Sequence, residues 1–547
     1  MKTKSFLFAS IVLVIILCTA MPAFGQATGD YQSSGSGNWN VVTTWQTFNG
    51  SSWNAAGAPP DSNAGTITIQ SGHTVTLPAG SPDTVRKSMI VVNGYLKDQA
   101  YFNMVSGKMT VDSGATYELA HPTNSGQGIP TATWKTGSTC LLTGIAGSTT
   151  GINANQAFYN LTINCPSWGS TNLNLGWNSG IENVAGNITI QNTGTARCYL
   201  CAPTANGSET LNIGGDLIID GSSSNASAQV LVSSNGTSNG GTTIIINVAG
   251  NITVTGNPAN NSYTNFSVSR GTQGGTGTTT WNLYGNSFSM SNATTQNSTT
   301  TPNGAKFVFA KAGKQTMTIS GVAFAGGCPV EVSKGTTLSM GTSVLAGAGT
   351  FALDSGATLE SGHSGGLDST LSNTGVKTLN NWASYTFNGT SAQVMGSLMP
   401  TTVKNLTINN PAGVTIPKAD MINGTLTLTS GILKIGTKNI IANSAAGGSP
   451  TSYVATDSGG TLKVNGVGSS QTVFPVGVVG GYAPVWMTNA GTVDTMTVRR
   501  VGYVRRGEKW RGESKSKMDH CRKHARGVQR NAAVWLGFFA RRSAVLH

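Results

Sequence analysis

Charged residues are scarce in this sequence, and those present are unevenly placed. Asp, Glu, Lys and Arg make up 10% of the 547 residues, with a formal net charge of +13. From Arg499 to His547 there are 14 basic residues against three acids, and none of the chain's 72 threonines. The net charge therefore describes this last segment and not the rest of the chain. Because no nucleic-acid-binding motif accompanies the basic run, we expect no specific nucleic-acid partner.

The composition changes too sharply at Arg499 for a domain linker. We predict that residues 499–547 are a basic tail that is disordered or comes from a shifted reading frame, and not part of the fold. The alternative is a basic anchor, which would attract anionic polymers in a salt-sensitive way. The tail's apolar run, Ala532 to Ala540, is too short to cross a bilayer.

Cysteine is also rare, with seven in the whole chain. One lies in the leader and one in the tail, which leaves five in the body: Cys140, Cys165, Cys198, Cys201 and Cys328. Five cysteines in a body of this length exclude a disulfide scaffold but leave a structural disulfide or buried thiols open. The spacing of Cys198 and Cys201 is typical of a metal knuckle or redox pair, yet no second pair exists. Since His73, His121 and His363 are scattered, we predict no metal and no cofactor.

A long apolar run occurs only at the start. Lys2 and Lys4 precede an apolar stretch from Phe6 to Leu17, and small residues follow at Ala23 and Gly25. This pattern predicts a secretory signal peptide over residues 1–25, with the mature chain starting at Gln26. We therefore expect an exported protein with no transmembrane span after the signal is removed.

Helical periodicity is missing, and alternation takes its place. The segment "GTITIQSGHTVTL" (Gly65 to Leu77) puts Ile67, Ile69, Val75 and Leu77 on one face and threonines on the other. Short strands of this kind, rich in β-branched residues and punctuated by Gly, Asn and Ser, predict an all-β fold.

These strands recur at intervals that indicate structural repeats. Glycines 186, 215, 250 and 285 stand in "VAGNITI", "IGGDLII", "VAGNITV" and "LYGNSFS", and "NLTIN" occurs at Asn160 and again at Asn405. Stacked coils that complete one another's cores would give such a pattern, so we predict a parallel β-solenoid with Gly and Asn at corners of positive φ. The alternative is an array of β-sandwich domains, which would need more Asn-Gly hairpins.

Four segments resemble a known class of proteins: Gly37 to Leu77, "YTFNGTSAQVMGS" from Tyr385, "VKNLTINNPAGVTI" from Val403, and "VFPVGVVGGYAPVWMTNAGTVDTMTVR" from Val473. The class is the large, repetitive, adhesin-like cell-surface proteins of Gram-negative bacteria that use type IX secretion. The resemblance implies a compact C-terminal β-module followed by further β-domains and a sorting domain. Here the module is interrupted at Arg499 and no sorting domain follows. The implied location is extracellular or at the cell surface, or periplasmic if the missing sorting domain prevents passage through the outer membrane.

The predicted organisation follows from these patterns. After the signal peptide, residues 26–120 form an N-terminal capping β-module in which Trp39, Trp45 and Trp53 cover the first coil. Residues 121–445 form the repetitive β-solenoid. Residues 446–498 form an incomplete C-terminal β-module, and the basic tail occupies 499–547.

Catalytic motifs are absent. The body has no nucleophile elbow, phosphate loop or calcium-binding nonapeptide. The best acid pair is Asp216 and Asp220, but Asp216 stands where other units carry Asn187 and Asn251, so we interpret it as a corner residue. His73 is interpreted as a turn residue before a strand. We predict no catalytic residues, with a β-helix polysaccharide lyase or glycoside hydrolase as the alternative.

Tryptophans offer a binding hypothesis. Trp168 and Trp177 lie within "CPSWGSTNLNLGWNSG", where exposed rings beside Asn amides would suit a sugar. We therefore predict a secreted, non-enzymatic, adhesin-like surface protein that binds extracellular polysaccharide or a cell-surface component. A further alternative is a threonine array, such as "GTLTLTSG" from Gly424, that binds ice or mineral.

Overall fold

The computed structural model has an all-β fold with mostly parallel strands. It describes residues 25–80, 88–100, 108–122, 128–147, 152–169, 173–175, 181–201, 207–234, 242–269, 277–295, 297, 304–321, 327–501 and 534–535. The chain divides into two compact units. Unit 1 comprises the chain up to His121 together with Pro130–Thr139, and unit 2 comprises Pro122–Ile129 and everything from Cys140.

Unit 1 contains two series of paired strands. The first is a sheet in the order β11 (Ala132–Trp134), β9 (Lys108–Val111), β7 (Met89–Val92), β5 (Ile67–Ile69), β1 (Tyr31–Ser33), β3 (Trp45–Phe48), β4 (Trp53–Ala55). The second is a parallel series of β2 (Gly37–Asn38), β6 (Thr74–Leu77), β8 (Tyr95–Asp98) and β10 (Thr116–Leu119). Ile67, Ile69, Val75 and Leu77 are buried, as their alternation predicts.

The first sheet of unit 1 ends on antiparallel strands. β1 pairs in parallel with β5 but antiparallel with β3, which pairs antiparallel with β4. The short η1 (Val42–Thr44) precedes β3. Trp39 and Trp45 are buried here with their rings edge to face at 4.9 Å between centroids, and Trp45 Nε1 donates to the Trp39 carbonyl. Large aromatics therefore fill the end of this unit.

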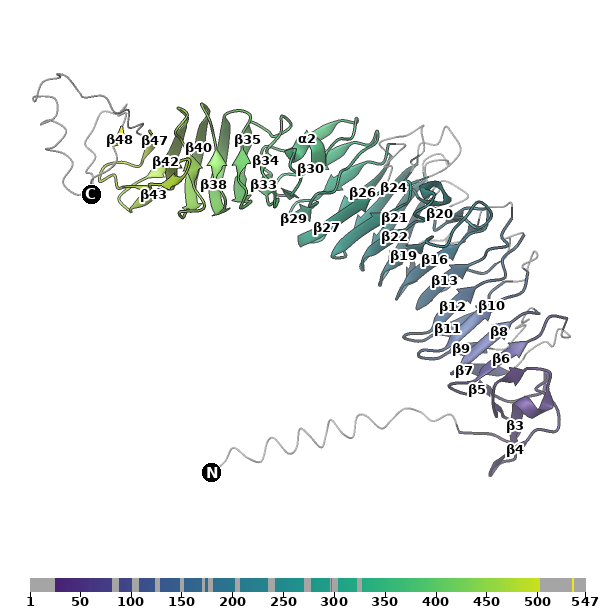
Figure 1. Cartoon of the computed structure of the whole chain (residues 1–547). Coiled ribbons are helices and arrows are strands. Elements are labelled where there is room, and N and C mark those ends of the chain that lie inside the picture. The colour runs from purple at the N-terminus through teal and green to yellow at the C-terminus, as the bar shows by residue number, and fades with distance from the viewer. Residues whose placement is uncertain are drawn as a thin grey trace, which may run out of the picture. The chain divides into compact units, whose positions relative to one another are not determined.

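Unit 2 is organised around one long sheet (Figure 1). Its strands follow one another in chain order: β12 (Thr139–Leu142), β13 (Asn160–Asn164), β16 (Ile188–Asn192), β19 (Leu217–Asp220), β22 (Ile252–Thr255), β25 (Ser287–Ser291), β27 (Gly313–Ser320), β29 (Thr336–Ser339), β31 (Thr358–Ser361), β33 (Ser384–Phe387), β36 (Asn405–Asn409), β38 (Asp420–Ser430), β40 (Asn439–Gly447), β42 (Thr461–Val467). β35 (Thr402–Val403) also pairs with β38. From β13 to β42 the pairings are parallel.

Three further sheets are interleaved with the long sheet along the chain. The second sheet is β15 (Ile181–Val184), β18 (Ser208–Ile213), β21 (Thr243–Val248), β24 (Thr278–Leu283), β26 (Ala305–Phe309), β28 (Val330–Val332), β30 (Phe351–Leu353), β32 (Lys377–Leu379). The third sheet is β14 (Leu173–Asn174), β17 (Cys198–Tyr199), β20 (Val230–Ser233), β23 (Thr264–Phe266). The C-terminal sheet is β34 (Gln393–Val394), β37 (Val414–Thr415), β39 (Leu433–Lys434), β41 (Val454–Ala455), β44 (Val476–Val478), β45 (Gly481–Tyr482). Two short helices, η3 (Asn261–Tyr263) and α2 (Gly366–Thr370), lie between strands.

The repeated segments stack in register in the long sheet. Ile188 pairs with Leu217, which pairs with Ile252, and the same alignment joins Ile190, Ile219 and Val254. All six side chains are buried. The sequence prediction that these residues stack in neighbouring repeats is therefore confirmed.

A column of polar side chains holds the same corner in successive repeats. In each case a side-chain oxygen accepts the backbone N–H of the residue at the same corner one repeat later, at 2.6–2.9 Å. The acceptor and donor pairs are Asn160 and Asn187, Asn187 and Asp216, Asp216 and Asn251, and Asn251 and Ser287. We call these five residues the corner column. Asp216 takes the same role as Asn187 and Asn251, which confirms the interpretation of Asp216 as a corner residue.

The corner glycines are needed for space and not for unusual backbone angles. Gly186, Gly215, Gly250 and Gly285 do not have positive φ, contrary to the expectation from sequence. A Cβ atom at Gly285 would lie 2.0 Å from the carbonyl oxygen of Gly250, and one at Gly215 would lie 2.2 Å from Asn187 Oδ1. Stacked turns approach one another closely here, so a side chain would collide with the neighbouring turn.

The described C-terminal part reverses direction. β47 (Asp494–Arg500) pairs antiparallel with β42, and β43 (Thr472–Phe474) pairs antiparallel with β46 (Val485–Met487). β47 continues through Arg499, and the Arg500 N–H donates to Thr456 Oγ1 at 2.7 Å. β48 (Val534–Trp535) pairs with the end of β47. Apart from this strand, the predicted tail beyond Val501 lies outside the described residues.

Candidate functional site

The two tryptophans predicted to bind sugar have different outcomes. Trp168 is buried, with 1% of its surface exposed, so the expectation of an exposed ring there is wrong. Trp177 lies outside the described residues. The buried ring of Trp168 therefore cannot form part of a surface platform.

Trp168 is buried because its segment stacks like a strand turn. The Thr195 N–H donates to the Trp168 carbonyl at 2.9 Å, and a Cβ atom at Gly194 would lie 2.0 Å from that oxygen. The turn of the next repeat therefore rests directly on Trp168. The stretch rich in Asn and Gly is typical of a surface loop in sequence, but the backbone at Trp168 is part of the stack.

A different set of turns presents an exposed tryptophan. Four turns that precede strands of the long sheet are joined by backbone hydrogen bonds: Gly313 N–H to Gly335 O, Gly335 N–H to Gly356 O, and Gly356 N–H to Trp382 O, at 2.9–3.2 Å. We call this series, continued by the bond from Lys404 N–H to Ala383 O, the turn column. The three glycines have positive φ of 79–96°, and the fourth turn carries Trp382 in their place.

Trp382 is half exposed, at 49% of its surface. Its backbone N–H donates to Asn380 Oδ1 at 2.8 Å, and Asn381 beside it is exposed. Lys404 Nζ lies 5.2 Å from the centre of the Trp382 ring, within the range of a cation–π contact. An exposed indole beside Asn amides was predicted at Trp168 and Trp177. Such an indole occurs instead at Trp382, where Lys404 adds a cation.

A second lysine lies along the same column. Lys334 is exposed, and its Cγ would lie 3.2 Å from a Cβ atom at Gly356. The aliphatic part of Lys334 therefore runs over the turn that separates it from the Trp382 turn. A side chain at position 356 would crowd the stem of Lys334, so the glycine leaves room for that lysine.

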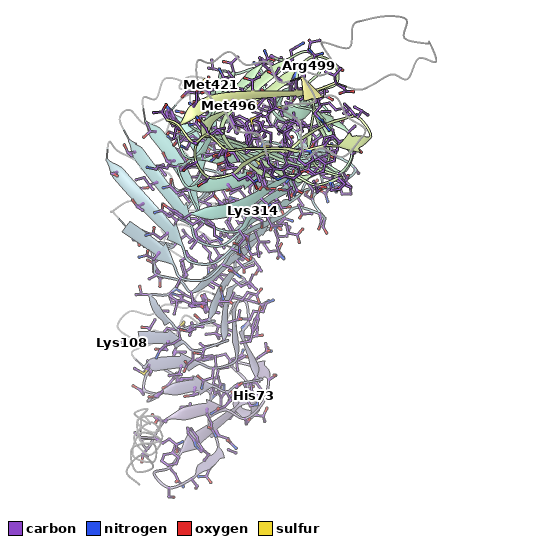
Figure 2. The ribbon with its side chains drawn as sticks, turned by 90° about the vertical axis from the view of Figure 1, so that its left-hand side faces the viewer. His73, Lys108, Lys314, Met421, Met496 and Arg499 are labelled. Atoms are coloured by element: carbon purple, nitrogen blue, oxygen red, sulfur yellow. The ribbon has the colours of Figure 1, made fainter. Side chains whose placement is uncertain are left out.

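The lysines near the turn column differ in their partners. Lys314, shown in Figure 2, forms an ion pair with Glu360 at 2.6 Å, and Lys306 forms one with Glu331 at 2.5 Å. Within the described residues, none of the ion pairs involves Lys334 or Lys404. Their charges are available to an anionic ligand.

The acids proposed for catalysis serve the backbone. Asp216 accepts the Asn251 N–H in the corner column, and Asp220 accepts the Ser222 N–H at 3.2 Å. Asp368 accepts from Ser397 and Leu398. Burial opposes ionisation of Asp368, but these bonds outweigh it and lower its pKa. These carboxylates act as caps of turns and strands.

In the part of the chain that the structure describes, the carboxyl groups of Glu209 and Asp420 are buried without a hydrogen-bond partner. Glu209 on β18 and Asp420 on β38 point inward. Burial raises the pKa of Glu209 to about 7, with the charge of Glu182 adding to the effect, and burial likewise raises the pKa of Asp420 to about 7 although Lys418 opposes it. Because Glu209 is only 4% exposed, it offers no carboxylate to a surface ligand.

Among the described residues, the five body cysteines are buried thiols that form no disulfide. Burial raises the pKa of the Cys165 thiol to about 12 and that of Cys198 further above its ordinary value. Such thiols are poor nucleophiles and poor metal ligands at neutral pH. Among the described residues, no group of three or more His, Cys, Asp or Glu side chains could hold a metal ion.

Two other sequence interpretations concern turn and surface residues. His73 follows the turn closed by its own N–H to the Gln70 carbonyl, directly before β6, as interpreted from sequence. Thr425, Thr427 and Thr429 alternate with buried leucines. Thr386, Thr407 and Thr427 are aligned on three neighbouring strands. The aligned positions on the next strands to either side are Glu360 and Ala446, so this row of outward-facing threonines is three strands wide.

Comparison with known proteins finds no matching family model, no matching curated protein and no matching solved structure. In the described part of the chain, no helix has the length and apolar character needed to cross a bilayer. The function must therefore be argued from the residues themselves.

Proposed function

We propose that the chain is a secreted, non-enzymatic, adhesin-like surface protein that binds glycans through the turn column. The observation that carries the proposal is Trp382, an exposed indole beside Asn amides and Lys404 on a backbone held by stacked hydrogen bonds. Apolar C–H faces of a sugar ring pack on indoles, while amides and ammonium groups satisfy its hydroxyls.

The proposed architecture is a parallel β-solenoid. Its support is the interleaving of strands: along the chain, strands of the long sheet alternate with strands of the second, third or C-terminal sheet, and each pairs in parallel with its counterpart one repeat later. An array of sandwich domains would instead pair most strands antiparallel within each domain. A solenoid suits surface binding because stacked turns form continuous columns of side chains.

A glycan array with the purified chain tests the function. The wild-type protein is expected to bind a subset of the polysaccharides on the array, and the Trp382→Ala variant is expected not to bind them. The matched control is Trp486→Ala, because Trp486 is similarly exposed at 47% but lies on the C-terminal β46. Equal loss with both variants, or no glycan bound by the wild type, would exclude this function.

The proposed location is extracellular or at the cell surface, following export by the signal peptide and the type IX class that the sequence resembles. Cell fractionation combined with protease treatment of intact cells tests it. Protein that is protected from protease in intact cells and released with the periplasm would contradict surface display.

A further inference from the structure

We propose that the ligand of the turn column is an acidic polysaccharide, held by stacking on Trp382 and by the ammonium groups of Lys334 and Lys404. This inference rests on the proposed glycan-binding function and adds the chemical class of the ligand.

The first argument is the balance of charge along the column. Lys334 and Lys404 make no ion pair within the described residues, whereas the lysines on neighbouring outward faces are neutralised by Glu331 and Glu360. The nearest acid in the column's turns is Asp354, whose carboxyl lies close to Glu331 and Lys306. The turn column therefore keeps a net positive charge that a neutral sugar would not use.

The second argument is spacing. Lys334, Gly356, Trp382 and Lys404 precede or begin β29, β31, β33 and β36, which are successive neighbours in the long sheet. Adjacent strands lie about 4.8 Å apart, so the two lysine positions span about 14 Å with the indole between them. A chain of sugars with a carboxylate or sulfate on successive units could meet the two cations and the ring together.

The third argument is rigidity. The backbone hydrogen bonds of the turn column fix the four turns, and Ala383, directly after Trp382, is fully buried. A surface that is already ordered loses little conformational entropy when a ligand binds. Gly356 contributes by leaving room for the aliphatic part of Lys334, which lies over it.

The test measures binding of polygalacturonate, uncharged dextran and a single-stranded DNA oligonucleotide to the full chain by titration calorimetry. Wild type is expected to prefer polygalacturonate. Trp382→Ala should weaken that binding about tenfold or more, a loss of about 1.4 kcal/mol, because it removes the apolar surface on which the sugar ring packs. Lys334→Gln and Lys404→Gln should each weaken it several-fold, and the effect should shrink at high salt because added ions screen the charges.

Two controls separate charge and stacking from general effects. Lys434→Gln removes an exposed lysine on β39, and Trp486→Ala removes an exposed indole; both should leave binding unchanged. The melting temperature of every variant is measured alongside. Loss of binding that follows loss of stability in all variants would assign Trp382 and Lys404 to packing and overturn the inference.

The outcomes separate the two proposals. Equal affinity for dextran and polygalacturonate, with no effect of the lysine variants but a large effect of Trp382→Ala, would overturn the acidic ligand and leave glycan binding standing. Failure to bind any polysaccharide would overturn both proposals. Preference for the oligonucleotide would reject a polysaccharide ligand in favour of nucleic acid.

Discussion

Two regions of unit 2 stack their strands in the same long sheet with repeats of different length. In the wide region, residues 181–291, corner residues bond across sequence separations of 29, 35 and 36. In the narrow region, residues 393–478, Asn405 accepts the Thr425 N–H across 20 residues, and Asn439 accepts the Thr461 N–H across 22 residues. The corner is nonetheless alike: Asn160 and Asn405, each opening an "NLTIN" strand, accept a backbone N–H from the next repeat. The corner is conserved between the regions while the arc between corners varies.

The additional residues of the wide region build the third sheet. That sheet is buried, with apolar side chains such as Val230 and Phe266. A polar cluster lies at its edge, where Arg197 donates to Asn265 Oδ1 at 3.0 Å and Ser267 donates to the same oxygen at 2.6 Å. The narrow region lacks these strands and passes directly from the long sheet to the C-terminal sheet. The longer repeats therefore add a sheet to the fold without altering the register of the long sheet.

The largest expected effect is the loss of core packing, which should be equal in the two regions. Ile219 stacks between Ile190 and Val254 in the wide region, and Ile408 stacks between Phe387 and Leu428 in the narrow one. Both are fully buried, so Ile219→Ala and Ile408→Ala should each cost about 2–5 kcal/mol. Amide hydrogen exchange of the flanking strands measures the loss. A cost below about 1 kcal/mol in one region only would show that its core is loosely packed.

Each region also contains one buried carboxyl group, which makes stability depend on pH. The pKa values of Glu209 and Asp420 are raised to about 7 in the folded chain. The folded state thus binds more protons than the unfolded state, and stability should fall as pH rises from about 4 to about 7 and stay low above that.

Removing these charges tests this dependence. Glu209→Gln and Asp420→Asn should each raise the free energy of unfolding at pH 8 by the order of 3 kcal/mol and change it little at pH 4. Denaturant titrations at both pH values check this result. A variant that destabilises equally at pH 4 and pH 8 would mean that the carboxyl group has a packing role and no electrostatic cost.

A smaller effect should distinguish the regions. Asn183, Asn212, Asn247 and Asn282 form a side-chain ladder along the second sheet at 2.8–2.9 Å. Asn247→Ala breaks two of these bonds and should cost about 1–2 kcal/mol. Thr425→Ala in the narrow region breaks one exposed bond to Ser444 and should cost under about 1 kcal/mol. Thermal melts of the two variants give the comparison, and a larger loss for Thr425→Ala would reverse it.

The smallest effect is expected at the corner itself. Asp216→Asn keeps the oxygen that accepts the Asn251 N–H and should change stability by less than about 0.5 kcal/mol. Asp216→Ala, which removes the oxygen, should cost about 1 kcal/mol. If Asp216 were catalytic, both Asp216→Asn and Asp216→Ala would abolish an activity that the wild-type protein has. Polysaccharide depolymerisation assays on the three proteins decide this point.

The sequence predicted the features that depend on short-range pattern. Alternation identified the inward faces of Ile67 and Ile188, and the spacing of repeated glycines identified the stack. Asp216 was assigned correctly because it aligns with Asn187 and Asn251. The reason for the corner glycines was wrong, since close approach between repeats depends on the neighbouring turn and not on the local sequence.

The binding site was less accessible to sequence reasoning. The exposure of a tryptophan depends on the neighbouring repeats, which the local sequence does not reveal: Trp168 is 1% exposed and Trp382 is 49% exposed. A signal did exist in the alignment of "SKGTT", "DSGAT" and "NNWAS", where one turn replaces glycine with tryptophan. That alignment becomes visible once the register of the strands is known.

The corner column also has a consequence for heredity. Successive repeats between Asn160 and Ser287, and again between Asn405 and Thr425, meet at a corner through one side-chain oxygen and one backbone N–H. A duplicated or deleted gene segment that encodes one such repeat would therefore restore the same junction. The wide and narrow regions demonstrate that the junction accepts segments of unequal length. Such a gene can change in length by recombination between its own repeats while the encoded protein keeps an uninterrupted core.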